Sequence, residues 1–326
     1  MKGRLIIYFK KPHLKDRWFW GDRYLRSLLH FFRKKNISSL ERVFINLCKA
    51  LKEKKISYIK NLPFSKIKEE DKIIVLGIGK NVLKGYNKKN KIVAGIGLMT
   101  HPNEWRTIFE DYPLATYLQH STWTATIYNR WYGENTSKIW PVGIDTYYWK
   151  AEETAARKDI LVYVKFLWDK EKNTTEILQP ILNLLDDHQI DYKLIAYGSY
   201  TIKEYKKILT NSIGMIFLCE HESQGLAYQE ALAMDVPIFA WDQGFWLDTN
   251  RFTWGEKNPV PASSIPYFDA TCGEKFKDLE EFNSKLPRFI ESIKKGRYEP
   301  RNYILKNLSL EKSAERMLMI LNEAYG

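Results

Sequence analysis

Two glutamates in the second half of the sequence have a spacing suited to binding polar ligands. Glu222 and Glu230 are eight residues apart, which is roughly 12 Å along a helix at about 1.5 Å per residue. An apolar run ends near Cys219 and a glycine follows at Gly225, so we expect a strand and then a helix. The free N–H groups and positive end of such a helix form a site for anions and hydroxyls. The two carboxylates could therefore hold two polyol groups with a diphosphate between them.

The elements that would position these glutamates form a regular alternation of apolar strands and helices. We expect strands at residues 4–9, 71–77, 91–97, 115–120, 139–145, 160–164, 192–197, 215–219 and 237–241. We expect helices from residue 22 onward, from a capping box at Ser38 and Glu41, and at 104–111, 123–131, 175–185, 203–209, 225–234, 278–290 and 310–325. This alternation predicts parallel sheets in an α/β fold. Residues 149–159 have no periodic apolar face and indicate a link between two units of similar size.

The segment 222–237 resembles the Glu-x7-Glu signature of family 4 of the retaining glycosyltransferases, which have the two-domain GT-B fold. Their usual form is close to Glu-Gly-Phe-Gly-Leu-x-x-x-Glu-Ala-x-Ala-x-Gly-x-Pro, and the residues in register here are Glu222, Gly225, Leu226, Glu230, Ala231, Ala233 and Pro237. Ser223 and Gln224 replace Gly-Phe, and Asp235 replaces a glycine. The resemblance implies two Rossmann-like domains facing across a cleft, residues 1–150 and 151–305, and a C-terminal helix in 306–326 that crosses back to the first domain.

Further positions extend the resemblance toward a donor site. Lys165 and, five residues later, Lys170 stand where the family has an Arg and a Lys that clamp the donor diphosphate, and Lys172 could replace the second. A lysine keeps the point charge but loses the bidentate contact of arginine. Gly198 ends a segment similar to the strand beside the nucleotide base, and residues 141–145 are similar to the Pro-x-Gly-Ile-Asp turn before the linker. The lysines can equally be solvated residues of a basic protein.

The resemblance and the sequence order together divide the candidate site into three sets. The catalytic set is Glu222, Lys165, Lys170 and His101, the last at a position where the family often has a histidine facing the donor sugar. The donor-binding set is Ser223, Gln224, Gly225, Leu226, Glu230 and Gly198. The acceptor-binding set is Gly21, Asp22 and Arg23, in an aromatic-rich loop, together with His221. The loop aromatics can equally pack a helix on the sheet, and His101 can be an ordinary polar loop residue.

The positive charge of the chain is concentrated near its N-terminus. The 326 residues carry a formal net charge of +12. Residues 1–60 hold 17 basic and 4 acidic residues, which leaves 34 basic and 35 acidic residues elsewhere. This asymmetry predicts an anionic partner for residues 1–60, such as a membrane surface or an acidic acceptor, unless the region is only a solvated basic face. No zinc-finger or RNA-recognition motif occurs and the charge lies away from the glutamates, so we expect no nucleic-acid partner.

Cysteine content and hydropathy predict a cytoplasmic protein that is at most peripheral to the cytoplasmic face of a membrane. Cys48, Cys219 and Cys272 are odd in number and widely spaced, which does not suit a disulfide framework. No signal-peptide pattern and no run of 18 apolar residues occurs. The sequence has no Asp-x-Asp and no Cys-x-x-Cys, so no metal or other cofactor is expected.

The resemblance implies a retaining, metal-independent enzyme of the hexosyltransferase type. It would move a sugar from a nucleotide-diphosphate sugar to a glycan or lipid-linked acceptor in the synthesis of cell-surface polysaccharide or glycoconjugates. The alternative is a non-catalytic module that binds a sugar nucleotide or a glycan on the same fold. Turnover, including slow hydrolysis of the donor, distinguishes the two.

Overall fold

The computed structural model describes residues 3–10, 38–77, 79–151 and 157–326. The chain divides into two compact units, and each contains one parallel sheet. Unit 1 comprises Met1–Gln119, Ile127–Trp140 and Ala314–Gly326, and unit 2 comprises His120–Thr126 and Pro141–Ser313. These bounds differ from the divisions at residues 150 and 305 that the sequence suggested. Gly21, Asp22 and Arg23, and the helix expected from residue 22, lie outside the described residues.

Within the described ranges, unit 1 has a six-stranded parallel sheet in the order β2-β1-β3-β4-β5-β6. Its strands are β1 (Leu5–Lys10), β2 (Tyr58–Lys60), β3 (Lys72–Gly77), β4 (Ile92–Gly95), β5 (Leu114–Gln119) and β6 (Ser137–Ile139). The expected strand 139–145 is wrong in extent, because β6 ends at Ile139. The chain then turns away, and Ile144 forms an isolated bridge with Ser309 instead.

The helices in the described part of unit 1 are α2 (Ser39–Glu53), α3 (Ile108–Asp111), the C-terminal part of α4 (Thr122–Tyr132) and most of α11 (Leu310–Tyr325). Ser38 caps α2 as expected, since its hydroxyl accepts a hydrogen bond from the Glu41 N–H at 3.2 Å. The expected helix 104–111 is reduced to a 3-10 turn at Pro102–Glu104 and the short α3.

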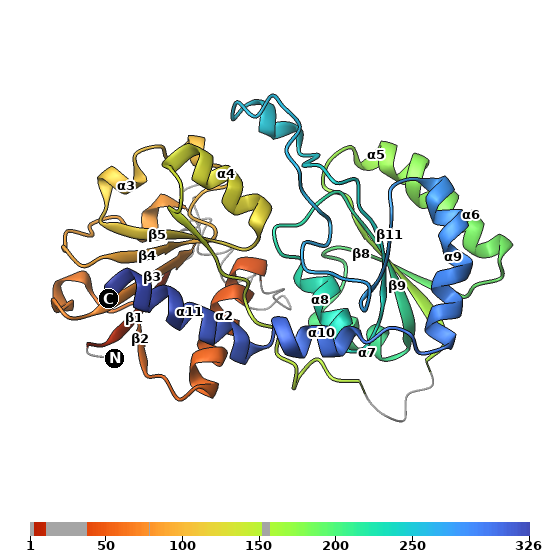
Figure 1. The fold of residues 1–326 in the computed structure, drawn as a ribbon, viewed down its shortest axis with the longest axis horizontal. Helices are drawn as coiled ribbons and strands as arrows, with labels where there is room; N and C mark the ends of the chain where they lie inside the picture. The colour runs from red at the N-terminus through yellow and green to blue at the C-terminus, as the bar shows by residue number, and fades with distance from the viewer. Residues whose placement is uncertain (1–2, 11–37, 78, 152–156) are drawn as a thin grey trace, which may run out of the picture. The chain divides into compact units, whose positions relative to one another are not determined.

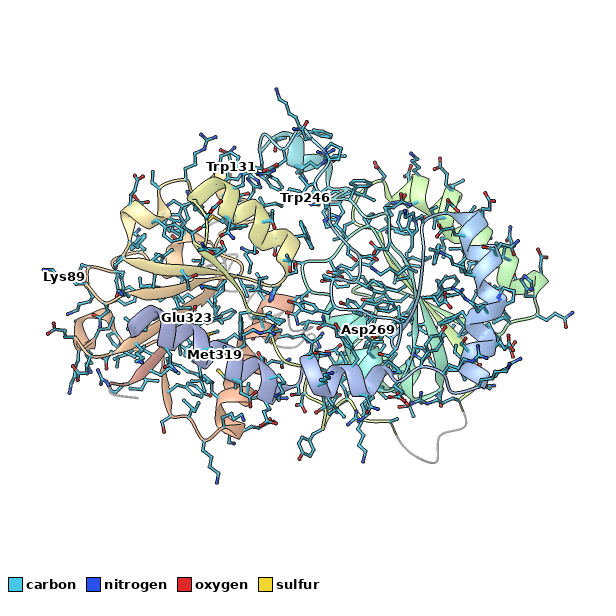
Figure 2. All side chains as sticks on the ribbon, in the orientation of Figure 1. Lys89, Trp131, Trp246, Asp269, Met319 and Glu323 are labelled. Atoms are coloured by element: carbon cyan, nitrogen blue, oxygen red, sulfur yellow. The ribbon has the colours of Figure 1, made fainter. Side chains whose placement is uncertain are left out.

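Helix α11 returns to unit 1, in agreement with the crossing-back C-terminal helix that the resemblance implied. Glu315 forms an ion pair with Lys54 at 2.9 Å, which places α11 beside the end of α2 (Figure 1). Farther along the helix, Glu323 (labelled in Figure 2) pairs with Lys138 at 2.8 Å. The hydroxyl of Tyr325 accepts a hydrogen bond from the N–H of Ile73, at 2.7 Å. The helix is therefore attached to this unit along its length.

The described part of unit 2 has a five-stranded parallel sheet in the order β11-β10-β9-β7-β8. Its strands are β7 (Asp159–Lys165), β8 (Tyr192–Ala196), β9 (Ser212–Cys219), β10 (Ile238–Trp241) and β11 (Gly273–Phe276). Its helices are α5 (Lys170–Asn173), α6 (Gln179–Asp187), α7 (Ile202–Thr210), α8 (Leu226–Ala233), α9 (Leu279–Lys294) and α10 (Pro300–Asn307). The two sheets with their alternating helices are the α/β fold that the sequence predicted.

Helices cover both faces of the second sheet (Figure 1). Successive residues of β7 point to opposite faces: Leu161 and Tyr163 pack against α7, α8 and α10, whereas Ile160 and Val162 pack against α6 and α9. Burial on both sides explains why these strands are continuous apolar runs rather than alternating ones. Their carboxyl ends are consequently the part of each strand where polar side chains can be placed.

A loop of residues 243–262 follows β10 and projects from unit 2, where Figure 1 shows it as the long blue-green excursion with a short helical turn. Its two arms are joined by a bridge between Phe245 and Pro261 and by a hydrogen bond from the Trp246 N–H to the Val260 carbonyl at 2.8 Å. Within the ranges described, no helix combines the length and apolar character needed to cross a bilayer.

Candidate functional site

The conformation of one glycine determines how α8 begins. Gly225 is the N-cap residue, has a φ of +84° and provides no side-chain cap. A Cβ at this position would lie 2.2 Å from Cε1 of Tyr228, so steric crowding as well as the positive φ requires glycine. The first N–H groups of α8 therefore depend on solvent or a ligand, and the helix dipole favours an anion there.

Lys165 and Glu222 meet at the carboxyl ends of two paired strands. Lys165 is the last residue of β7 and is in register with Cys219, the last residue of β9. Its Nζ lies 2.5 Å from Oε1 of Glu222 and 4.8 Å from the ring centroid of Tyr197. Burial acts to lower the pKa of Lys165, but the charge and hydrogen bond of Glu222, together with Cys219 and Tyr197, outweigh it, and the pKa is raised. The pair thus holds a permanent cation and a carboxylate beside the start of α8.

The backbone of Glu222 is fixed from both sides. Its N–H donates to the carbonyl of Ser263 at 3.0 Å, and its carbonyl accepts from Nε1 of Trp123 at 2.9 Å. Asp242, directly after β10, holds the Ser263 segment in place, because its carboxylate accepts from the Ser263 hydroxyl at 2.8 Å and from Nζ of Lys275 at 2.8 Å. The segment after β9 and the connection from β10 to β11 are thereby joined at Glu222.

Sequence reasoning missed Glu220, which positions the loop that follows β7. Its carboxylate accepts hydrogen bonds from the N–H groups of Leu167 and Trp168, both at 3.1 Å, and from Nδ2 of Asn173 at 3.2 Å. The side chain is only 2% exposed. Burial raises the pKa of this carboxyl, and the backbone hydrogen bonds act in the opposite direction. Glu220 therefore ties the loop between β7 and Lys170 to the segment after β9 that contains Glu222.

The other expected residues of this loop region are open to solvent. Lys170 is exposed at the first position of α5. Ser223 is exposed in the turn before α8, and Gly198 is exposed just after β8, with a φ of +82°. A Cβ at Gly198 would meet no atom within 4 Å, so packing leaves room there. Their donor-binding roles stay predictions.

Gln224 has a structural partner that the sequence did not suggest. Its side-chain amide accepts from the Val142 N–H at 2.9 Å and donates to the Val142 carbonyl at 2.7 Å, so it pairs with that backbone as a strand would. It also donates to Oε1 of Gln229 at 2.9 Å. Leu226 packs partly buried against the core, and Glu230 is 1% exposed in the interior of α8. The Pro-x-Gly-Ile-Asp turn is thus bound to the start of α8.

Two arginines bind the opposite end of α8. Arg157 donates to the carbonyls of Met234 at 2.6 Å and Asp235 at 2.9 Å. Arg301, from α10, donates to the carbonyl of Ala233. Positive charge at a helix C-terminus complements the macrodipole. Helix α8 is therefore held at both ends. Gln224 binds the backbone of Val142 at its start, and the two arginines bind the carbonyls at its C-terminus.

His221 lies in a cluster of tryptophans that the sequence analysis did not identify. Its ring stacks on Trp168, with centroids 4.4 Å apart and planes inclined by 19°. Trp123 meets its ring edge-on at 5.9 Å, and Trp246 at 6.3 Å. Trp246, labelled in Figure 2, stacks in turn on Trp254. Burial, and then the charge of Lys165, lowers the pKa of His221 to about 3. The imidazole is therefore neutral near pH 7.

A signal for this cluster was present in the sequence. Trp123, Trp168 and Trp246 each follow the carboxyl end of a predicted strand, and the chain contains 11 tryptophans in all. All three belong to unit 2, because residues 120–126 are part of it. Aromatic residues directly after parallel strands lie where ligands bind in α/β sheets, which would have singled them out.

His101, the fourth expected catalytic residue, belongs to unit 1. It is 1% exposed and caps a 3-10 turn, since its Nδ1 accepts from the Asn103 N–H at 3.1 Å. Its ring meets Trp131 edge-on at 5.2 Å. Its role toward a donor sugar stays a prediction. Across the described residues, no group of three or more His, Cys, Asp or Glu side chains is arranged to hold a metal ion.

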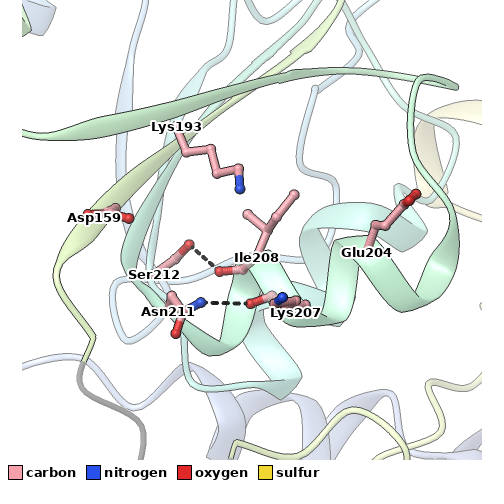
Figure 3. A pocket seen from close by; sticks show the side chains of 7 residues that line it. All are labelled: Asp159, Lys193, Glu204, Lys207, Ile208, Asn211 and Ser212. Carbon is pink, nitrogen blue, oxygen red and sulfur yellow. Dashed lines mark hydrogen bonds between the residues drawn. The ribbon is translucent and has the colours of Figure 1, made fainter.

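A pocket at the other edge of the second sheet differs from this site (Figure 3). It is lined by Asp159, Lys193, Glu204, Lys207, Ile208, Asn211 and Ser212. Asp159 and Ser212 are the first residues of β7 and β9, so the pocket lies at the amino ends of the strands. Open α/β sheets bind their ligands at the carboxyl ends. The edge that carries Lys165 and Glu222 is therefore the better candidate.

No protein-family model and no curated protein sequence matches the chain. Solved structures match it in fold. A variant of S. aureus TarM, in complex with fondaparinux, alpha-GlcNAc-glycerol and UDP, superposes with a TM-score of 0.51 and 12% identity over 78% of this chain. The pneumococcal O-GlcNAc transferase GtfA, in complex with UDP and GlcNAc, gives 0.51 and 11% over 80%. This chain spans 56% and 58% of their lengths, respectively.

A third similar structure has nearly the same extent as this chain. AviGT4, a glycosyltransferase involved in avilamycin A biosynthesis, superposes with a TM-score of 0.51 and 9% identity over 99% of this chain and 98% of its own. Identities this low establish fold alone. With its two parallel sheets, alternating helices and returning C-terminal helix, the chain has the GT-B fold of these glycosyltransferases.

Proposed function

We propose that this protein is a retaining glycosyltransferase that moves a sugar from a nucleotide-diphosphate sugar to a glycan or lipid-linked acceptor. The observation that carries the proposal is the Lys165–Glu222 pair, with 2.5 Å between Nζ and Oε1, at the carboxyl edge of the sheet and beside the uncapped start of α8. The fold of solved glycosyltransferases supports it, and two of those structures contain UDP. We place the reaction in the synthesis of cell-surface polysaccharide or glycoconjugates, in the cytoplasm and without a metal.

The proposed chemistry is electrostatic stabilisation of a leaving diphosphate. Lys165, Lys170 and the first N–H groups of α8 stabilise the negative charge that develops as the bond from the anomeric carbon to the diphosphate oxygen breaks. The acceptor hydroxyl oxygen forms the new bond on the same face, and a diphosphate oxygen takes its proton. Glu222 orients the sugar hydroxyls and Glu230 the ribose.

The remaining expected residues complete the proposed site. Gly198 and Ser223 line the donor, and His101 faces its sugar. Gln224 acts through Val142, because its amide is engaged with that backbone at 2.9 and 2.7 Å. The acceptor-binding residues in this proposal are Gly21, Asp22 and Arg23, together with His221.

The test begins with the donor. We expect a thermal-shift panel of nucleoside diphosphates and nucleotide sugars to give a selective rise in melting temperature, since a ligand at 100 times its Kd adds about 2.7 kcal/mol of stability. Lys165→Ala should abolish the rise. Lys295→Ala, which removes the exposed lysine at the C-cap of α9, should leave it unchanged. No rise with any nucleotide contradicts the proposal, and an inverted anomer in the product contradicts retention.

One observation favours a second function, a non-catalytic module that binds sugar nucleotides or glycans. Lys165 is already neutralised by Glu222, so its charge could serve to hold the fold and a bound ligand rather than to assist bond cleavage. Release of free sugar or transferred product from a bound donor separates the two functions. Saturable binding with no turnover would favour the module.

We also propose that the basic N-terminal region binds an anionic membrane surface. Its described part includes α2, where Lys49 and Lys52 are exposed, and both Lys55 and Lys60 are exposed beyond it. Each lysine near an anionic bilayer contributes about 1 kcal/mol. Flotation with vesicles that contain phosphatidylserine should recover the protein, whereas neutral vesicles should not. Equal recovery with both kinds of vesicle, or with neither, contradicts this proposal.

A further inference from the structure

His221 is a buried imidazole whose ring nitrogens form no hydrogen bond to the residues that the structure describes. The residue is 7% exposed, and Nδ1 is fully buried with no hydrogen-bond partner among the residues that the structure describes. Within the same residues, no hydrogen bond to Nε2 is formed either. A buried polar atom without a partner is costly, so native structures keep one mainly where a ligand or a mechanism requires it.

The surroundings of His221 indicate which ligand would supply the missing contact. Trp168 stacks on one face of the imidazole at 4.4 Å, and Trp123 presents an indole at 5.9 Å. Both tryptophans are partly exposed, so the cluster has an accessible edge. The immediate cation, Lys165, is already paired with Glu222. The cluster therefore offers apolar aromatic surface and an uncharged hydrogen-bonding nitrogen.

These properties match a sugar ring. A pyranose has apolar C–H faces, which suit indole rings, and hydroxyl groups around its edge, which suit a neutral nitrogen. Glu222 follows His221 directly in the chain and α8 begins four residues later. The cluster thus lies at the same strand end as the groups assigned to the diphosphate and sugar hydroxyls.

We propose that Trp168, His221 and Trp123 form a subsite for an uncharged sugar ring. The inference rests on the proposed function and deepens it by naming the part of the substrate that this cluster binds. The ring can be the sugar of the donor or the terminal sugar of the acceptor, because both have the same chemistry. A donor sugar would affect donor binding and hydrolysis, whereas an acceptor sugar would affect transfer alone.

The decisive variant is His221→Phe, which keeps an aromatic ring in the stack and removes both nitrogens. We expect it to melt at a higher temperature than the wild type, because it no longer buries an unsatisfied nitrogen. We expect its affinity for UDP to stay within twofold, and the sugar-dependent step to fall at least tenfold. A gain in stability with a loss of function cannot arise from poor folding. Trp149→Phe, a core tryptophan of the same unit packed on Tyr205, is the control and should not change the sugar-dependent step.

Three measurements on these variants separate the two sources of the ring. Affinities for UDP, UDP-glucose and UDP-GlcNAc report the donor sugar, as does donor hydrolysis without acceptor. Transfer to neutral p-nitrophenyl glycosides reports the acceptor. A donor subsite lowers the preference for the sugar nucleotide over UDP and lowers hydrolysis. An acceptor subsite leaves both unchanged and lowers transfer alone. Trp168→Ala should act in the same direction as His221→Phe.

Two outcomes would overturn the proposal. One is a His221→Phe variant that binds, hydrolyses and transfers as the wild type does, which would make the cluster packing only. The other applies where the variants lose transfer alone and so assign the ring to the acceptor: a p-nitrophenyl glucuronide accepted as well as the glucoside would remove the requirement for an uncharged ring. If the wild type binds no nucleotide, the proposed function fails separately. Quenching of tryptophan fluorescence by neutral oligosaccharides that is lost in His221→Phe would then still support a sugar subsite. If the wild type shows no such quenching either, both the proposed function and the sugar subsite are rejected.

Discussion

Each unit contains a buried carboxylate that forms an ion pair. In unit 1 it lies at the amino end of a strand, and in unit 2 it follows the carboxyl end of a strand. Asp71 directly precedes β3 in unit 1 and accepts from Arg4 through Nε at 2.9 Å and Nη2 at 2.6 Å, and from the N–H groups of Arg4 at 3.3 Å and Lys68 at 2.8 Å. The Glu222 carboxylate at the carboxyl edge of the second sheet accepts, among described residues, from Lys165 alone. A carboxylate saturated with donors stabilises a fold, whereas one with unused acceptor capacity can still bind a ligand.

The largest effect is expected when the positive charge of Lys165 is removed from the Lys165–Glu222 pair. Lys165→Met should lower kcat/KM for transfer about a thousandfold, or about 4 kcal/mol, because it removes the cation nearest the proposed diphosphate. It also leaves Glu222 without its partner, which destabilises the fold. The double variant Lys165→Met/Glu222→Gln should regain the stability without the activity. Recovery of activity in the double variant would show that the pair is structural, like Arg4–Asp71.

Removing the charge of Asp71 in unit 1 should lower stability without affecting ligand binding. Asp71→Asn removes the charge that four donors stabilise, so we expect a loss of about 2 kcal/mol in the free energy of unfolding. Nucleotide affinity per folded molecule should not change. Urea titration and calorimetric binding on the same samples measure both quantities. A loss of nucleotide affinity larger than the loss of folded protein would mean that Asp71 also serves the ligand site.

Acid titration separates the two regions by the pH at which each acts. The Arg4 guanidinium beside Asp71 lowers the pKa of that carboxyl to about 2, so its contribution is complete above about pH 4 and is lost as the pH falls toward 2. His221 has its pKa lowered to about 3 in the fold. The unfolded chain binds that proton from about pH 6.5 downward, so stability falls between about pH 6.5 and 3 by up to about 1.4 kcal/mol per pH unit.

The same variants used above test this assignment. His221→Phe should flatten the stability profile between pH 6.5 and 4, and Asp71→Asn should flatten it only below about pH 4. Chemical denaturation at a series of pH values provides the measurement. If wild type and His221→Phe have identical profiles, the imidazole takes up its proton at the same pH in the folded protein as in the unfolded chain, which contradicts the assignment.

The smallest expected effect concerns Glu220, which resembles Asp71 in using its oxygens on backbone donors. Glu220→Ala frees the loop that carries Lys170 and should weaken donor affinity about tenfold, or about 1.4 kcal/mol. Glu220→Gln keeps an accepting oxygen and should restore most of it. Equal losses in both variants would assign the effect to the charge of Glu220 rather than to its hydrogen bonds.

The long apolar strands were predictable because burial on both faces makes them continuous runs, as at Ile160–Val164. β2 and β11 were not, because they contain only three and four residues and have no such run. The order of the strands within each sheet is set by packing between distant segments, which the sequence does not display.

The site was predictable where neighbours in the sequence are neighbours in space. Glu222 beside the start of α8 follows from one local motif. The pairing of Gln224 with Val142, the hold of Glu220 on the loop after β7, and the tryptophans around His221 all join segments far apart in the chain. Such contacts form only when the sheet is complete. The residue types suggest which side chains could take part, but they do not predict which of them meet.

The return of residues 314–326 to unit 1 bears on the order in which the protein is made. The strands of unit 1 leave the ribosome before any of β7–β11, yet the helix that binds Ile73 through Tyr325 and Lys54 through Glu315 is translated after all of them. Unit 2 can therefore finish folding while unit 1 still lacks a helix that packs on it. A nascent chain that ends at residue 313 would expose apolar surface of unit 1 to chaperones, although every strand of both sheets had already been synthesised.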